Sequence, residues 1–310
     1  MSVQQEAFRV AVTGGTGFVG RTTIAQACAL GLPLNALARQ PQAACAGVTW
    51  VNGALDRDDC LQRLMADADV VLHIAGVVNA PDKAGFHTGN IAGTLAAVRA
   101  ARAAGIRRFV HVSSLAAREP HLSHYGWSKY KAERIVMASG LDWTIIRPPA
   151  IYGPADTEML ELFRLASRRL MLLPPGGRLS VIEVSDLARL LLACVQDDEI
   201  SIGGMYEPDD GVEGGWSHKS FGRAIGWALG KKVVTLATPQ PLLQLAARID
   251  QFSRREKAKL TADRVNYFCH PDWVINPARR PPAALWQPQV NTRAGLKQTA
   301  EWYRKQGWLR

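Results

Sequence analysis

The sequence predicts an α/β fold, with a doubly wound parallel sheet and a smaller, largely C-terminal lobe. Short apolar runs rich in Val and Ile alternate with stretches of helical pattern, and turn residues become dense after residue 153. Apolar runs that are continuous rather than alternating indicate strands buried on both faces. Their alternation with helices indicates βαβ units, whose right-handed crossovers place helices on both sides of the sheet.

The strand and helix segments follow one another along the first half of the chain. The expected strands span residues 10–12, 34–37, 48–51, 70–74, 109–112 and 143–146. The expected helices between them span residues 22–30, 58–66, 93–104 and 129–139. This series predicts one large domain over residues 1–153.

The second half of the chain has a different character. Gly and Pro cluster at 174–177, 203–204, 208–211 and 214–215, which are turn signals. Six of the nine tryptophans lie beyond residue 210. We expect a smaller substrate-binding lobe over residues 154–310, with elements around 180–196 that return to complete the sheet.

The composition limits the class of protein. With 310 residues, 47% of them hydrophobic and 21% charged, the chain is expected to bury a sizeable core, which excludes a disordered, collagenous or coiled-coil protein. No apolar run approaches the roughly 20 residues of a membrane-spanning helix. The first residues show no secretory signal pattern, and the five cysteines form no CxxC pair. We therefore expect a cytoplasmic protein with no metal site.

The positive charge is concentrated in the last hundred residues. Residues 1–210 hold 20 Lys+Arg and 21 Asp+Glu, a net charge of −1, whereas residues 211–310 hold 17 and 6, a net charge of +11. This basic lobe either meets an anionic partner or is a solvated surface. Because no nucleic-acid-reading motif accompanies the charge, we expect no nucleic-acid partner.

Residues 241–259 have the pattern of a basic amphipathic helix. Leu242, Leu245, Ala246, Ile249 and Phe252 recur at roughly helical spacing, and basic residues gather mostly towards the far end. We expect this helix to cap the substrate pocket with its apolar face turned inward. The alternative is peripheral docking on an anionic membrane surface.

A glycine-rich turn is the strongest signal for a ligand. The run Thr13-Gly14-Gly15-Thr16-Gly17-Phe18-Val19-Gly20 leaves a strand-like segment and opens a helical one. Glycines at such a turn allow the backbone to approach a pyrophosphate, which the positive end of the helix favours. The turn predicts a Rossmann-type dinucleotide site in residues 1–153, with contacts from Gly14, Thr16, Gly17, Phe18, Val19 and Gly20.

The end of the second strand indicates which dinucleotide binds. An NAD site usually has a carboxylate there, but no Asp or Glu occurs between Arg21 and Val51. Arg39 stands there instead, and a guanidinium pairs well with a 2′-phosphate. We expect NADP(H), with NAD as the alternative.

A hydroxyl, a phenol and an amine follow the fifth strand. Ser114 ends that strand, and Tyr125 and Lys129 follow four residues apart, which places both on one face of a helix. A nearby ammonium favours the phenolate, so we expect the pKa of Tyr125 to be lowered, making it a general acid/base at neutral pH. Ser114 would polarise the substrate oxygen.

These segments resemble the extended short-chain dehydrogenase/reductase family, which includes NAD(P)-dependent epimerases and dehydratases and the 3β-hydroxysteroid dehydrogenases. The resemblance is carried by TGGTGFVG (13–20), DVVLHIAG (69–76), NIAGT (90–94), FVHVSS (109–114), YGWSK (125–129) and IIRPPAIYGP (145–154). VSDLA (184–188) and ALWQP…GLKQTAEWY (284–303) resemble motifs of the family's substrate lobe.

The resemblance implies further roles. Tyr125 would be the acid/base, Lys129 would bind the nicotinamide ribose and tune Tyr125, and Ser114 would hold the reacting oxygen. Asn90 would support a water-linked proton relay or brace its helix. The cofactor would also be contacted by Leu55, Ala75, Gly76, Pro148 and Ile151.

The chain departs from the family pattern at three places. Gly53-Ala54-Leu55 lacks the usual carboxylate after the third strand, the interval from Ser114 to Tyr125 is short, and Glu183 replaces a histidine before VSDLA. The first departure removes a contact to adenine, and the second removes loop that would grip substrate.

The expected function is that of an NADP(H)-dependent oxidoreductase, transferring hydride between nicotinamide and a carbonyl or secondary alcohol of a small molecule. The Trp-rich lobe favours a hydrophobic, steroid- or terpenoid-like substrate. The alternatives are a sugar-nucleotide epimerase or dehydratase, and a non-catalytic NADP(H)-binding protein. A homodimer is the assembly that the resemblance suggests.

Overall fold

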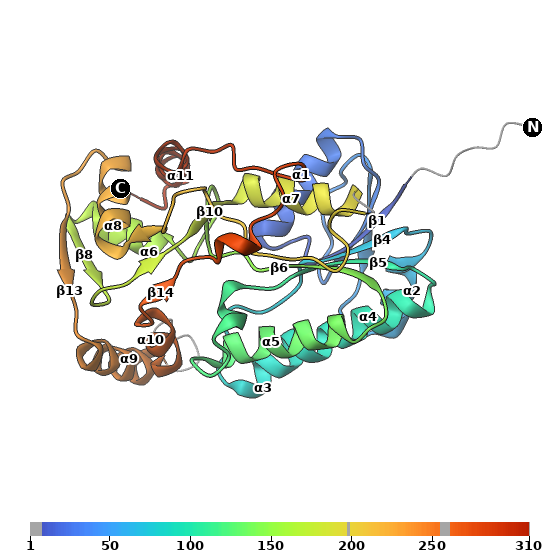
Figure 1. The fold of residues 1–310 in the computed structure, drawn as a ribbon, viewed down its shortest axis with the longest axis horizontal. Coiled ribbons are helices and arrows are strands. Elements are labelled where there is room, and N and C mark those ends of the chain that lie inside the picture. The colour runs from blue at the N-terminus through green and yellow to red at the C-terminus, as the bar shows by residue number, and fades with distance from the viewer. Residues whose placement is uncertain (1–7, 197–198, 255–260, 310) are drawn as a thin grey trace, which may run out of the picture.

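The computed structural model describes residues 8–196, 199–254 and 261–309 (Figure 1). A central parallel sheet runs in the order β11-β6-β5-β4-β1-β2-β3. Its strands are β1 (Val10–Thr13), β2 (Leu34–Ala38), β3 (Val48–Asn52), β4 (Val70–His73), β5 (Arg108–Val112), β6 (Asp142–Ile146) and β11 (Met205–Tyr206). The order reverses direction between β1 and β4, which confirms the predicted doubly wound Rossmann-type sheet.

Helices cover both faces of this sheet, as Figure 1 shows. On one face lie α1 (Phe18–Ala29) and α7 (Val184–Gln196), and on the other lie α2 (Asp58–Met65), α4 (Gly93–Ala103) and α5 (His124–Met137). Alternate strand residues serve the two cores: Val10 and Val12 pack with the leucines of α7, whereas Ala11 packs with those of α2. Burial on both faces explains why the strands read as continuous apolar runs.

Short elements connect the strands at the edge where the site lies. They are α3 (Lys83–Phe86), a π-helical turn (His87–Ala92) and a 3₁₀ turn (Leu115–Arg118). Two helices beside the site begin earlier than predicted: α1 begins at Phe18 instead of residue 22, and α5 begins at His124 instead of residue 129. In α5 the reason is Ser123, whose hydroxyl accepts a hydrogen bond from the Gly126 backbone at 3.0 Å and so caps the helix ahead of Tyr125.

The rest of the chain forms a lobe of small sheets and helices. β7 (Ala150–Tyr152) pairs with β10 (Val181–Glu183), β8 (Leu170–Leu173) with β13 (Val234–Ala237), and β9 (Arg178–Leu179) with both β12 (Trp216–Ser217) and β14 (Asp272–Trp273). The helical elements are α6 (Leu160–Ser167), α8 (His218–Ala228), α9 (Gln240–Arg254), α10 (Ala262–Phe268), the 3₁₀ turn Pro277–Arg279 and α11 (Thr292–Lys305).

The lobe has a core of its own. Phe163 and Tyr303 are fully buried and meet edge to face at 5.1 Å. Because α7 and β11 return to the sheet after the lobe has begun, the chain crosses between the two parts more than once. The domain division at residue 153 stays a prediction.

The orientation predicted for the amphipathic helix is wrong. α9 buries Ala247 completely but leaves Leu242, Leu245 and Ile249 in solvent. The helix ends at Arg254, and residues 255–259 of the predicted span lie outside the described part of the chain. Ala247 faces the protein, whereas Leu242, Leu245 and Ile249 face away from it, so these three residues do not close the pocket. Among the described residues, no helix is long and apolar enough to cross a bilayer.

Candidate active site

The loops after β1 and β4 touch at the point where the strand order reverses. Gly14 has a φ of +75°, and a Cβ there would lie 2.5 Å from the backbone nitrogen of Ala75. A Cβ on Gly20 would lie 2.1 Å from the Gly14 carbonyl oxygen. Only glycine allows these approaches, which open the carboxyl edge of the sheet to a ligand.

The N-terminus of α1 faces this edge. The helix begins at Phe18, and its N-cap residue, Gly17, has no side chain with which to cap the free N–H groups. Thr16 and Val19 are half-buried beside it. Free N–H groups and the positive end of the helix dipole suit a diphosphate, so the residues present fit a dinucleotide.

Two predicted cofactor contacts lie further along the same edge. Arg39 follows β2 directly and is exposed. Leu55 follows β3, and its Cδ1 would lie 2.9 Å from a Cβ on Gly93, so it packs against the start of α4. Both residues follow strands on the β2–β3 side of the sheet, whereas Ser114 follows β5 on the other side of β1.

Lys129 is buried between α5 and the ends of β4 and β5. Its Nζ donates a hydrogen bond to the Val112 carbonyl oxygen at 2.9 Å. A Cβ on Gly76 would lie 3.0 Å from the same Nζ, so Gly76 leaves space beside the amine. Burial lowers the pKa of Lys129 to about 8, against the opposing effect of Glu133. The amine is therefore partly neutral in mildly alkaline solution.

Asn90 clamps the loop after β4. Its Oδ1 accepts a hydrogen bond from the Val77 nitrogen at 2.7 Å, and its Nδ2 donates to the Val77 carbonyl oxygen at 3.0 Å. The same Nδ2 lies 2.8 Å from the hydroxyl of Ser128 on α5. Both polar atoms of the side chain therefore hold the loop after β4 against α5, and the two predicted roles of Asn90 stay predictions.

Tyr125 and Ser114 are brought together by α5 and the end of β5. Burial raises the pKa of Tyr125, while a hydrogen bond with Ser114 acts in the opposite direction. The predicted lowering of this pKa by Lys129 is therefore wrong for the protein as described. The phenol loses hydration, and the ammonium is directed to Val112. Ser114 also accepts a hydrogen bond from the Ala116 nitrogen at 3.2 Å, which fixes its side chain.

The segment after β6 closes the site from the other side. The Pro148 carbonyl oxygen accepts a hydrogen bond from the Leu115 nitrogen at 2.9 Å, so Pro148 lies next to the residue that follows Ser114. Ile151 lies on β7 opposite Ile182 and packs against the same core as Val19. The structure thus gathers these residues around one edge of the sheet.

A buried ion network that the sequence analysis missed anchors α5. Glu133 accepts two hydrogen bonds from Arg147, at 2.8 and 2.6 Å, and a third from the hydroxyl of Ser113 at 2.5 Å. Arg147 also pairs with Glu207 at 3.6 Å. The sequence signal for this network was Arg147 in the segment IIRPP. An arginine at the end of a buried strand needs a carboxylate partner, so its presence there predicts an ion pair.

The lobe places α10 against the start of α5, a contact that sequence reasoning also missed. The backbone nitrogen of His124 donates a hydrogen bond to the Asp263 carboxylate at 2.9 Å. Tyr267 of α10 lies close enough to Tyr125 that, besides burial, the Tyr125 phenol helps to raise the pKa of Tyr267, and the Tyr267 ring packs on Trp273 at 4.5 Å. The two tyrosines are 142 positions apart in the numbering, and no local pattern links them.

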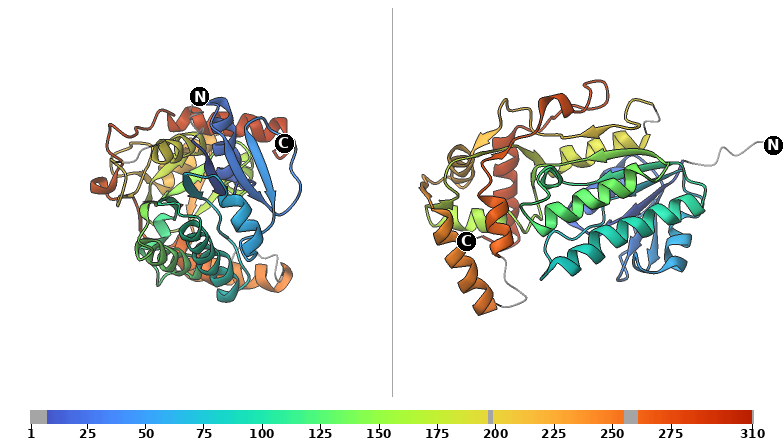
Figure 2. Two further views of the ribbon diagram at one scale, coloured as in Figure 1. Left: turned by 90° about the vertical axis from the view of Figure 1, so that its right-hand side faces the viewer. Right: turned by 60° about the horizontal axis from the view of Figure 1, so that its bottom comes forward.

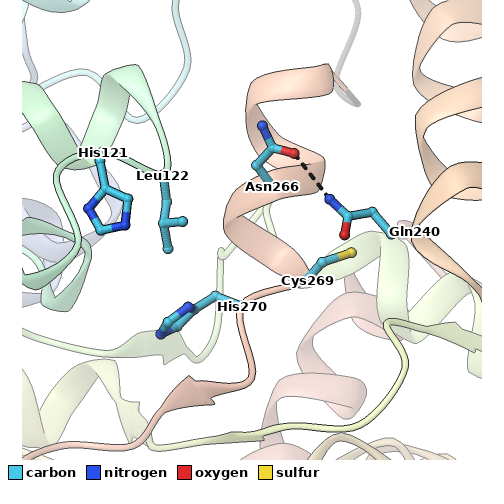
Figure 3. A pocket seen from close by; sticks show the side chains of 6 residues that line it. All are labelled: His121, Leu122, Gln240, Asn266, Cys269 and His270. Carbon is cyan, nitrogen blue, oxygen red and sulfur yellow. Dashed lines mark hydrogen bonds between the residues drawn. The ribbon is translucent and has the colours of Figure 1, made fainter.

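A cleft of about 270 Å³ lies between the loop before α5 and the helices α9 and α10 (Figure 3). In Figure 3 a hydrogen bond of 3.2 Å joins Gln240 of α9 to Asn266 of α10 on its far side. Leu122 lies three residues before Tyr125, and Asn266 precedes Tyr267 directly. The cleft is lined by His121, Leu122, Gln240, Asn266, Cys269 and His270.

Comparisons with known proteins agree with this geometry. Residues 14–198 match the model of a family described as NAD(P)H-binding. The chain is 36% identical to a ceramide reductase of Caulobacter vibrioides, over 97% of this chain and 96% of that protein. A ketoreductase of Stigmatella aurantiaca, acting on 4-hydroxy-2-methyl-3-oxo-4-farnesyl-3,4-dihydroquinoline-1-oxide, is 35% identical over 49% of this chain and 53% of its own.

The fold also matches solved structures. The Bordetella bronchiseptica enzyme WbmG in complex with NAD superposes with a TM-score of 0.76 at 18% identity, covering 100% of this chain and 98% of that one. At this identity the likeness concerns the fold.

Proposed function

This chain belongs to the NAD(P)H-binding family and to the extended short-chain dehydrogenases/reductases, and on that premise we propose that it reduces a ketone on a lipid-like molecule with NADPH. An NAD(P) cofactor and an enzymatic activity follow from the family. The observation that carries the finer proposal is the meeting of Ser114 and Tyr125 beside Lys129 and Gly76 at the carboxyl edge of the sheet.

Gly14, Gly20 and the N-terminus of α1 would hold the diphosphate, and Gly76 with Lys129 would hold the nicotinamide ribose. When bound, the reduced cofactor supplies a hydride. Asn90 keeps the backbone of Val77 in place beside that position. These residues bind and orient, and they carry no proton to the substrate.

Tyr125 is the proton donor in this proposal. A phenol whose pKa is raised by burial stays protonated at neutral pH, which is the form that reduction of a ketone requires. Ser114 would donate a hydrogen bond to the same carbonyl oxygen and fix its position. The Lys129 ammonium uses one N–H to bond the Val112 carbonyl oxygen, and another N–H would bond the ribose. Because Lys129 lies one helical turn from Tyr125, this bond would fix the cofactor relative to the phenol.

Arg39 supports a preference for NADPH over NADH. It is exposed directly after β2, and the sequence has no carboxylate between Arg21 and Val51 to accept a ribose hydroxyl. A guanidinium at this place would pair with the 2′-phosphate.

The substrate class rests on the relatives and on the surroundings of Tyr125. Ceramide and a farnesyl-bearing quinoline are named for the two reductases that this chain resembles. The Phe86 ring lies 6.1 Å from the Tyr125 ring, and on the side of the lobe Tyr267, which is near Tyr125, packs on Trp273 at 4.5 Å. An aromatic surround suits an apolar chain attached to the ketone.

The test is a comparison of substrates with purified protein. We expect NADPH to be consumed in the presence of a ketone analogue of a ceramide, with slower consumption for a short-chain ketone and none for UDP-glucose. Consumption of no ketone, together with conversion of UDP-glucose to another UDP-sugar, would contradict the proposal and favour an epimerase.

A further inference from the structure

The outward face of α9 is apolar. Leu242, Leu245 and Ile249 are three and four positions apart, and they are 56%, 53% and 61% exposed. Residues at this spacing share one side of a helix. Single exposed apolar residues need no explanation, but three in a row on one helix face do.

A second apolar strip lies on the ribbon that leads into α9. Leu172 of β8 stands opposite Leu236 of β13, and both are exposed, as is Val234 two positions earlier. The other face of the ribbon is covered, because Met171 is fully buried against α8. We call these six residues the β13–α9 surface: Leu172, Val234, Leu236, Leu242, Leu245 and Ile249.

The β13–α9 surface lies at the mouth of the cleft. Gln240, the first residue of α9, lines the cleft in Figure 3, and the apolar residues of α9 begin two positions later. Figure 1 places β13 and α9 at one end of the molecule, and α9 projects from its body in the right-hand view of Figure 2. A flat partner could therefore contact α9 without obstruction by the sheet.

Positive side chains border the β13–α9 surface. Arg168 and Arg169 precede β8, Lys232 precedes β13, and Arg248 lies on α9 itself; all four are exposed. Apolar residues bordered by cations are the chemistry that recognises an anionic lipid surface.

We propose that the β13–α9 surface docks on a bilayer containing anionic lipid, so that an amphipathic substrate passes from the bilayer into the cleft lined by Gln240 and Asn266. The route to the active site rests on the proposed function, whereas the docking does not. A second copy of the chain is a poorer occupant. A symmetric dimer would place the same cations against each other, which is unfavourable.

Vesicle sedimentation tests the docking. Wild-type protein is expected to sediment with vesicles of phosphatidylcholine and phosphatidylglycerol, and much less with phosphatidylcholine alone or at high salt. The double variant Leu242→Gln/Ile249→Gln should bind at least ~10-fold more weakly, since two apolar side chains no longer enter the lipid. The matched control Leu30→Gln/Met137→Gln changes two exposed residues, one directly after α1 and one at the end of α5, and should bind as wild type does.

Two activity measurements separate this proposal from the function above. With a water-soluble short-chain ketone, wild type and both double variants should have equal rates; with a ketone embedded in vesicles, only Leu242→Gln/Ile249→Gln should be slower. Equal vesicle binding by that variant and wild type would overturn the docking, as would a wild-type dimer that the variant dissociates. Docking without reduction of any ketone would overturn the proposed function and leave the surface standing.

Discussion

The Nζ of Lys129 donates a hydrogen bond to the carbonyl oxygen of Val112, 2.9 Å away. Val112 ends β5 two residues before Ser114, and Lys129 lies one helical turn after Tyr125. The bond therefore ties together the two elements that carry the proposed proton donor and its hydrogen-bonding partner. The positions of Ser114 and Tyr125 depend on this junction of β5 and α5.

Replacing the phenol tests the proton donor. Tyr125→Phe keeps the ring beside Phe86 but removes the hydroxyl, so kcat for ketone reduction should fall about 10²- to 10⁴-fold. The Kd for NADPH, measured by quenching of protein fluorescence, should change little. Ser128→Ala on the same helix removes a hydroxyl that is bonded to Asn90 and to the backbone carbonyl oxygen of Tyr125 but leaves the phenol in place, so it should cost much less activity. A Tyr125→Phe variant with near-normal kcat would remove Tyr125 from the mechanism.

The pH dependence of the rate tests Lys129. Burial brings the pKa of its ammonium down to about 8, so the cationic form is complete only below that pH. If the cation holds the cofactor ribose, kcat/KM for NADPH should fall as the pH rises through about 8. Lys129→Met should be slow and should lack this descent. If kcat/KM of Lys129→Met fell with pH in the same way as that of wild type, the titrating group would be another residue.

The glycine turn and the Ser114, Tyr125 and Lys129 spacing were predictable because each is local. A strand, a tight turn and a helix lie within a few residues of one another, so the order of residues determines what meets. The parallel sheet was predictable for a related reason, since its strands are buried on both faces and read as unbroken apolar runs.

The contacts between the sheet and the lobe were not predictable in this way. Tyr267 lies near Tyr125, and Asp263 accepts a hydrogen bond from the backbone of His124. In both cases the two residues are more than a hundred positions apart, and no sequence motif links them. The direction of the Tyr125 pKa shift was missed because burial depends on packing, and spacing shows only that an amine is near. The expected inward orientation of the α9 apolar face was wrong because an amphipathic pattern does not say which face meets protein.

Removing the charge at residue 39 tests the choice of cofactor. Arg39→Ala should raise the Kd for NADPH about 10- to 100-fold, the loss expected for a charge-assisted hydrogen bond, and should leave the Kd for NADH nearly unchanged. Titration calorimetry with both cofactors measures the two constants. Parallel weakening of both would place Arg39 away from the 2′-phosphate.

The buried ion network should matter more for stability than an exposed pair. Glu133→Gln leaves Arg147 without its bidentate partner in a buried setting, and the free energy of unfolding should fall by about 3–5 kcal/mol. Glu301→Gln, which breaks an exposed pair with Lys297 on α11, should leave the urea midpoint nearly unchanged. Equal midpoints for both variants would mean that the network contributes little.

Transfer of deuterium tests the central claim most directly. NADPH carrying deuterium at the nicotinamide C4, on the face that is transferred, is incubated with the enzyme and a ketone analogue of a ceramide, and the alcohol is analysed by mass spectrometry. We predict one deuterium on the carbinol carbon of the product with wild type, and almost no product with Tyr125→Phe. An alcohol without deuterium, or equal labelled product from both proteins, would contradict the account.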